Sequence, residues 1–196
     1  MTRAHAIDGW RIDVTVRTGV PRALSGAEAA RVVAAALAAA GAPRPASLSV
    51  VLTDDAELAE LNETHLGQDG PTDVLSFPLL PPEAFPSHVD RPASGRPASG
   101  GPGSTTGAAA LVAPFVLPPR ARPHLGDIAI SVERAIAQAV DGRGGQTGTV
   151  RWSAAAELRL LLTHGALHVC GWNHAEPIEE AAMRALERGL LGDVPA

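Results

Sequence analysis

The sequence contains no lysine and no tyrosine, only one cysteine, and aromatic residues at just 3% of its 196 positions. The single cysteine, Cys170, excludes an internal disulfide and is compatible with a reducing cytosol. No stretch approaches the ~20 apolar residues that a membrane-spanning helix needs. The uncharged run that begins at Val32 follows a charged segment, so it predicts an alanine-rich helix rather than a signal peptide. We therefore expect a cytoplasmic protein without a membrane partner.

Because lysine is absent, arginine supplies all 16 of the basic residues, and the formal net charge is −5. An acidic total argues against a general nucleic-acid binder that is held by a broad basic surface, and we expect no DNA partner. A local cluster of arginines that binds a few phosphates remains compatible with this charge.

The spacing of apolar residues predicts an α+β protein with a single domain over residues 1–196. Four segments show the alternation or apolar concentration of strands: Gly9–Thr18, Ala46–Leu52, Thr72–Leu79 and Leu125–Ser131. About five helices are expected: Ser25 to Ala40, Asp54 to Leu66, Val132 to Val140, Trp152 to Val169, and one that begins at Pro177.

Residues 80–124 differ in composition from the rest of the chain. They contain ten prolines and the near repeat RPASGRPASGGPG, with little periodicity. Such a composition buries too little apolar surface to fold by itself, so it predicts a loop inserted between two strands. A second glycine-rich stretch, Gly142–Gly148, follows a helix and lacks the lysine of phosphate-binding loops, so we interpret it as a connector.

Three of the seven histidines lie within the stretch THGALHVCGWNH. His164 and His168 are four residues apart on a predicted helix, which places both imidazoles on one face, one turn apart. Gly171 can end the helix and turn the chain, which brings His174 toward the same point. This pattern predicts a site for one metal ion, and zinc is the ion that such a helix of the zincin type usually binds.

Other interpretations of the three histidines are a set of ordinary hydrogen-bonded side chains and a structural metal site. Closed structural sites usually have four ligands, often cysteines, whereas three histidines leave a position open for water and favour catalysis. Cys170 points away from His168 around the helix and is not expected to be a ligand. The spacing is also that of the peptidase motif HExxHxxGxxH, but Gly165 stands where those enzymes have their glutamate base, which argues against a peptidase.

The segment HGALHVCGWNH resembles the signature HGxLHLxGYDH of the YbeY family of bacterial metalloproteins. DGPTDVLSFP (Asp69–Pro78) and LGDIAIS (Leu125–Ser131) are similar to two further family segments, in the same order. The resemblance covers the chain from about Val51 to Leu191 without the inserted loop. It implies an α+β fold whose four-stranded mixed sheet packs against the helices.

The resemblance also implies a function. It is that of a zinc-dependent, single-strand-specific endoribonuclease in 16S ribosomal RNA maturation and ribosome quality control, with ribosomal RNA and the small subunit as partners. It assigns one Zn²⁺ per chain to His164, His168 and His174, which act through zinc-bound water. Thr72, Asp73 and Ser76 are implied to line the cleft, whereas the residues alone favour an ordinary edge strand in which Asp73 and Ser76 face solvent.

Four positions depart from the family pattern: His65, Trp172 and Asn173 are smaller changes, and Leu66 is the one that bears on activity. Leu66 replaces an arginine that is thought to help stabilise phosphate charge, and leucine cannot pair with a phosphate. Arg134, Arg151 and Arg159 are alternative sources of positive charge. Two further hypotheses therefore stand beside the nuclease: a ribosome-associated metal-binding factor with weak or no nuclease activity, and a metal-dependent hydrolase of another substrate.

Overall fold

The computed structural model describes residues 1–88, 122–141 and 152–192. The chain forms one five-stranded mixed sheet in the order β1-β2-β3-β5-β4. Its strands are β1 Thr2–Ile7, β2 Trp10–Val16, β3 Ala46–Thr53, β4 Val74–Pro78 and β5 His124–Ser131. The central strands β2, β3 and β5 are parallel, while β1 and β4 pair antiparallel with β2 and β5 at the two edges.

The predicted α+β class is confirmed, and the described residues contain five α-helices and one short 3₁₀ turn. They are α1 Gly26–Ala39, α2 Asp55–Leu66, η1 Pro82–Ala84, α3 Val132–Asp141, α4 Ala154–Val169 and α5 Pro177–Leu191. Within these ranges, no helix combines the length and the apolarity that crossing a membrane requires.

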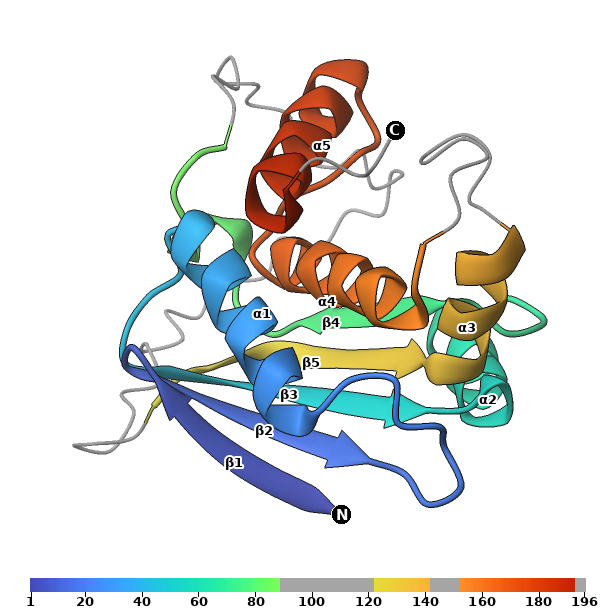
Figure 1. Cartoon of the computed structure of the whole chain (residues 1–196). Coiled ribbons are helices and arrows are strands. Elements are labelled where there is room, and N and C mark those ends of the chain that lie inside the picture. The colour runs from blue at the N-terminus through green and yellow to red at the C-terminus, as the bar shows by residue number, and fades with distance from the viewer. Residues whose placement is uncertain (89–121, 142–151, 193–196) are drawn as a thin grey trace, which may run out of the picture.

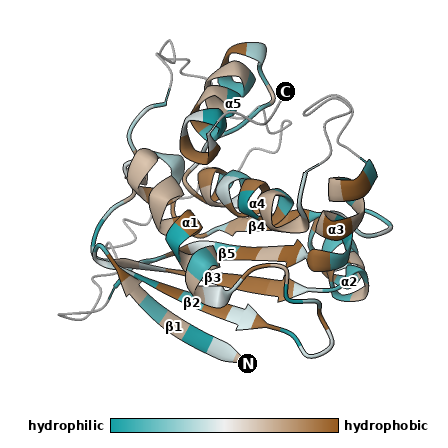
Figure 2. Cartoon of the chain, viewed as in Figure 1, coloured by the Kyte–Doolittle hydropathy of each residue, from teal (hydrophilic) through white to brown (hydrophobic). Residues whose placement is uncertain are grey.

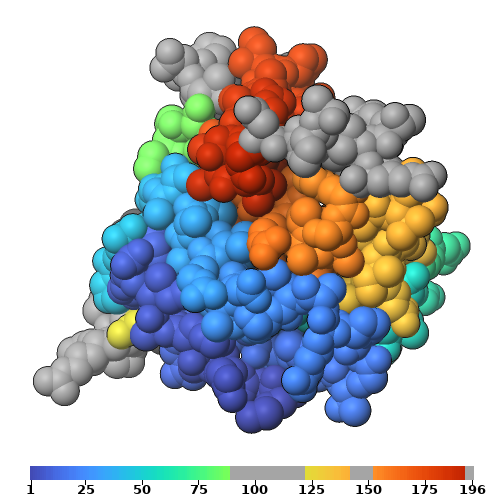
Figure 3. Space-filling model, in the orientation of Figure 1, coloured from blue at the N-terminus to red at the C-terminus, as the bar shows by residue number. Residues whose placement is uncertain are grey.

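The main core lies between the sheet and helices α1 and α4, which cover the same face (Figure 1). Alternate residues of β2, namely Trp10, Ile12 and Val14, point toward these helices and are buried. Apolar residues accordingly gather on this face of the strands and on the helix surfaces above it (Figure 2). Helix α5 packs on α4 and α1 and forms the outermost layer (Figure 3).

Helix α2 lies on the other face of the sheet, beside the edge strand β4. It forms a small second cluster in which Leu58 and Leu61 contact Leu75, Phe77 and Ala129. The outer face of the sheet is therefore covered by this helix near β4.

The sheet has one strand more than the four that the sequence predicts. Strand β1 was missed because its residues are mostly exposed and show no apolar alternation. It pairs with β2 through a two-residue turn at Asp8 and Gly9, both of which have positive φ. Asp-Gly is a strong signal for such a hairpin turn, so a local clue was present.

Both ends of the predicted insertion at residues 80–124 belong to the described structure. Phe85 is only 6% exposed and joins the main core, and strand β5 already begins at His124. Residues 89–121, which make up most of the predicted insertion, lie outside the described residues, as does the connector Gly142–Gly148. For these residues the sequence interpretation stays a prediction.

Candidate metal centre

Helix α4 carries two of the three histidines. It begins after Ser153, whose hydroxyl accepts a hydrogen bond from the Ala156 amide, as an N-cap does. It ends at Val169, and Gly171 then takes a φ of +82°, a conformation that glycine adopts without strain. This turn reverses the chain and brings His174 back to the end of the helix.

The three imidazoles converge as the sequence predicts. One ring nitrogen from each of His164, His168 and His174 lies within 4.8 Å of the others. The Nε2 atoms of His164 and His168 are 3.0 Å apart. His164 and His168 are partly buried, whereas His174 is exposed, so the cluster is open to solvent on the side of His174.

The other ring nitrogens of the two helical histidines are held by outer partners. His168 Nδ1 donates to the Trp172 carbonyl oxygen at 2.9 Å, and His164 Nδ1 donates to Glu187 Oε1 at 2.8 Å. A carbonyl and a carboxylate only accept hydrogen bonds, so each Nδ1 carries a proton, and Nε2 is the nitrogen of each ring that faces the other histidines. The two Nε2 atoms lie 3.0 Å apart, close enough to bind one cation together.

The protonation of His168 also suits a metal ligand. Burial, followed by the neighbouring charge of His164, lowers the pKa of His168 from 6.5 to about 4. The ring is therefore neutral near pH 7, which is the form that binds metal. Cys170 is buried, and burial raises the pKa of its thiol to about 12, in agreement with the prediction that it is not a ligand.

Glu187 is the residue of this site that the sequence interpretation missed. It lies on α5, 23 residues from His164 in the chain, and is buried. The available signal was a carboxylate within the apolar stripe of α5, four residues after buried Met183. A carboxylate that accepts from a ligating histidine fixes the ring and increases its basicity.

Replacing Glu187 with glutamine is expected to weaken zinc binding by about 10- to 100-fold, because the amide oxygen keeps the hydrogen bond but not the negative charge. The zinc Kd, measured by competition with a chromophoric chelator, checks this. Glu180→Gln on the same helix is the matched control, since Glu180 pairs with Arg184 instead. Equal zinc affinities for the two variants would contradict the role of Glu187.

The turn that follows α4 is held by a segment just after β4. Pro82 packs against Gly171, His88 hydrogen-bonds to the Cys170 carbonyl at 3.1 Å, and the His88 ring stacks on Trp172 with centroids 4.3 Å apart. These contacts fix the backbone that presents the Trp172 carbonyl to His168. After the turn, Asn173 Oδ1 accepts from the His174 amide and orders the chain there.

Gly165, next to His164, faces the sheet rather than the histidine cluster. A Cβ at this position would lie 2.9 Å from Ile128 Cγ2 and 3.2 Å from both Ser76 Oγ and Val74 Cγ2. The glycine therefore allows α4 to approach the sheet closely. A glutamate here would point into strands β4 and β5, which reinforces the argument against a peptidase of the HExxH type.

Of the three residues expected to line the cleft, one lies within β4 and two lie just before it. Ser76 faces α4 and donates to the Gly165 carbonyl oxygen at 3.2 Å, directly beneath the histidine helix. Thr72 and Asp73 precede the first residue of the strand, where Asp73 accepts from the Val74 amide and from Gln138 of α3. Only Ser76 is thus brought to the backbone beside a candidate ligand, and the cleft-lining role of all three stays a prediction.

The structure also places the charged residues that were considered as substitutes for the missing arginine. Arg134 lies 3.4 Å from Asp55, and Arg159 lies 3.5 Å from Glu28 of α1, so each has a carboxylate partner. Arg151 lies outside the described residues. Leu66 is the last residue of α2 and is 57% exposed.

Comparison with known proteins shows which family the whole chain resembles. The family model described as Endoribonuclease YbeY matches residues 17–194. A curated relative of that name from Salinispora tropica is 40% identical over 151 residues, or 77% of this chain and 76% of that protein. Another, from Parvibaculum lavamentivorans, is 30% identical over 189 residues, or 96% of this chain and 84% of that protein.

A solution structure from Thermotoga maritima covers 91% of this chain and 89% of its own, with 17% identity and a TM-score of 0.45, which is too low to carry an argument. The family model and the curated relatives are sufficient without it. Because the family match spans most of the chain and is supported by relatives of 30–40% identity, the chain belongs to the YbeY family of endoribonucleases.

Proposed function

We propose that this chain is a cytoplasmic, zinc-dependent endoribonuclease that cleaves single-stranded ribosomal RNA during 16S maturation and ribosome quality control. Membership of the endoribonuclease family supports the reaction class. The observation that supports the zinc dependence is the convergence of one ring nitrogen from each of the three histidines within 4.8 Å of the others, with the Nε2 atoms of His164 and His168 3.0 Å apart. The ribosomal target rests on the resemblance of three ordered sequence motifs to the family.

His164, His168 and His174 would hold the ion, because one ring nitrogen of each lies within 4.8 Å of the others. A bound zinc ion supplies Lewis acidity, which lowers the pKa of water and polarises a phosphate oxygen. The protein's own contribution is orientation: Glu187 and the Trp172 carbonyl fix the two helical rings. Exposure of the cluster on the side of His174 leaves room for a phosphodiester to approach.

Removal and return of zinc tests the proposal. The protein stripped with a chelator is expected to lose cleavage of a single-stranded 16S ribosomal RNA fragment, and stoichiometric zinc is expected to restore it. The same sequence annealed to its complement should be cut far more slowly. The rate of fragment appearance on a denaturing gel measures both effects, and metal-stripped protein that cuts at the native rate would refute zinc dependence.

A second candidate is a ribosome-associated, zinc-binding factor with weak nuclease activity, and Leu66 is the residue that favours it. If the missing cation limits cleavage, Leu66→Arg is expected to raise kcat about 10-fold or more by stabilising phosphate charge. Val140→Arg, which adds the same charge at a position on α3 that is 58% exposed, is the control. No difference between the two variants would count against Leu66 as the cause of weak activity.

A further inference from the structure

Part of the outer sheet face, away from α2, carries small and polar residues instead of an apolar cluster. The side chains of β2 that alternate with buried Trp10, Ile12 and Val14 point outward, and they include Arg11 and Asp13. Across the strands, Arg11 pairs in register with Ser47, and Ser47 with His124. No described helix packs on this part of the sheet, so these side chains are not explained by the core.

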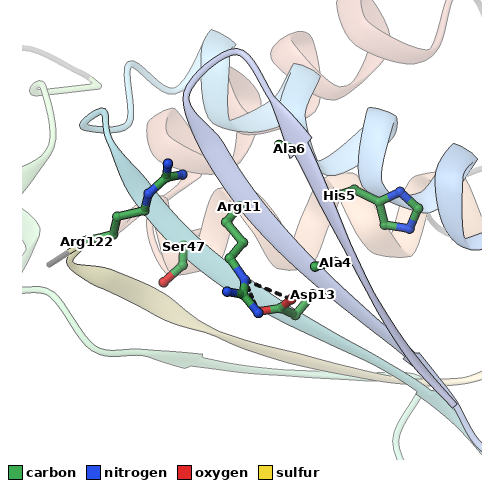
Figure 4. Close-up of a pocket in the computed structure, with 7 residues that line it drawn as sticks. All are labelled: Ala4, His5, Ala6, Arg11, Asp13, Ser47 and Arg122. Atoms are coloured by element: carbon green, nitrogen blue, oxygen red, sulfur yellow. Dashed lines mark hydrogen bonds and ion pairs between the residues drawn. The ribbon is translucent and has the colours of Figure 1, made fainter. Parts of the chain in front are cut away.

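These residues form a hollow of about 640 Å³. Its lining combines the small residues Ala4, Ala6 and Ser47 with the longer Arg11, Asp13 and Arg122. Figure 4 shows Arg11 of β2 beside Asp13 and Arg122 on the segment before β5, with Ser47 between the two arginines in this view. Two guanidinium groups and one carboxylate give these residues a net charge of +1, on a chain whose formal total is −5.

Both arginines have hydrogen-bonding capacity to spare. Arg11 bonds the Asp13 carboxylate through Nε only, and its side chain is 57% exposed. Arg122 makes one long hydrogen bond of 3.4 Å to the Gly9 carbonyl. The terminal amino groups of a guanidinium form the planar fork that suits two oxygens of a phosphate.

A hydrogen-bonded row of polar side chains borders the hollow. His124 lies between Ser47 and Asp127, with Nδ1 3.0 Å from Ser47 Oγ and Nε2 3.0 Å from Asp127 Oδ1. Because the Asp127 carboxylate accepts from Nε2, the Ser47 hydroxyl donates to Nδ1, and its proton is not available to a phosphate oxygen. The lining of the hollow contains no tryptophan or phenylalanine, and its one ring is the imidazole of His5, so it offers few of the rings on which RNA bases usually stack.

The hollow and the histidine cluster lie back to back across β5. His124 and Asp127 of this strand point to the outer face, whereas Gly126 faces α4, and a Cβ there would lie 3.1 Å from Val169 Cγ1. Val169 follows the candidate ligand His168 directly in the chain. The sheet thus separates the hollow from the histidine cluster, and an RNA strand that reaches both would pass around its edge.

We propose that this hollow is a second RNA-binding site, where Arg11 and Arg122 hold a backbone phosphate of the single strand whose other part lies at the histidine cluster. The inference rests on the endoribonuclease function. Because phosphate and not base is bound, the contact is independent of sequence and weakens with salt. Binding at this second site raises the affinity for long RNA substrates and leaves the rate of the chemical step unchanged.

Binding of a fluorescent 20-nucleotide single strand by a protein with the His168→Ala change, which prevents cleavage, tests the proposal. Adding Arg11→Gln and Arg122→Gln is expected to raise the Kd about 10-fold. The slope of log K against log salt is expected to fall by about 0.7, the value for one neutralised phosphate of a single strand. Arg22→Gln with Arg31→Gln removes the same charge from exposed positions elsewhere and should change neither quantity.

Equal weakening by the two double variants would overturn the proposal, since it would show a general charge effect. Displacement of the RNA by micromolar inorganic phosphate, or by polyglutamate as effectively as by unlabelled RNA, would also overturn it, because the site would then bind free phosphate or an acidic peptide. Arg122→Gln alone, which loses only the long bond to Gly9, provides a milder variant if the double one does not fold.

Cleavage by the protein with its histidines intact separates this inference from the proposed function. The arginine double variant is expected to raise KM for the 20-nucleotide strand with kcat unchanged, and to cut a 4-nucleotide strand as the unaltered protein does. If the unaltered protein cuts RNA and the variant has the same KM for the long strand, only the second site is refuted. If the unaltered protein does not cut RNA, the proposed function fails, while the binding comparison still decides the second site.

Discussion

Replacing His168 with alanine is expected to abolish both tight zinc binding and RNA cleavage. His168 is the most constrained of the three candidate ligands: its Nδ1 is held by the Trp172 carbonyl, and its Nε2 faces that of His164. Loss of a ligand should lower zinc affinity by more than the roughly 10- to 100-fold that loss of an outer partner costs. Metal content and the cleavage rate of single-stranded ribosomal RNA, measured on the same preparation, check this result.

His65→Ala is the control for this experiment. His65 is an exposed histidine at the end of α2, with its ring against Phe77, and its loss should leave zinc content and cleavage unchanged. Cleavage by His168→Ala at the native rate after metal loss would refute the proposed chemistry. Full zinc content in His168→Ala would instead show that the three histidines are not the site.

The second large effect is expected at Gly165. Gly165→Ala should lower the free energy of unfolding by about 1 kcal/mol, because crowding against Ile128 costs roughly 1–3 kcal/mol and the better helix propensity of alanine returns about 1 kcal/mol. Gly165→Glu should cost about 3–5 kcal/mol, since it would also bury an unpaired charge. Urea unfolding followed by circular dichroism measures both.

Gly189→Ala on α5 is the matched control, since nothing lies within 4 Å of the added methyl group. It should raise the free energy of unfolding by up to about 1 kcal/mol through helix propensity alone. If Gly165→Ala stabilises the protein as much as Gly189→Ala does, then α4 does not need its close approach to the sheet.

The histidine cluster could be predicted because its determinants are local. The four-residue spacing of His164 and His168 fixes their common helix face, and Gly171 permits the turn. Glu187 could not be placed in the same way, because its contact with His164 depends on how α5 packs on α4. The register of the outer sheet face, which places Arg11 beside Ser47, is likewise set by strand pairing and not by local sequence.

In the fold, too, the elements set by local sequence could be predicted, and those set by tertiary contacts could not. The strands that alternate buried and exposed residues were predicted to within a few residues, whereas β1 was missed because its partner and turn, not its own pattern, place it in the sheet. Gly165 was interpreted only through its missing side chain, as a sign that no glutamate base is present. Its contacts with Ile128 and Ser76 add a packing role that only the tertiary structure reveals.

All three candidate ligands come from one helix end and the turn that follows it, within eleven consecutive residues. An ion bound there would cross-link only chain segments that are already neighbours, so it would close a very short loop and remove little entropy from the unfolded chain. The sheet and its helices hold together through their own cores. Binding of the ion would therefore add little to the stability of the fold. The metal could be exchanged or lost while the scaffold that presents the histidines persists.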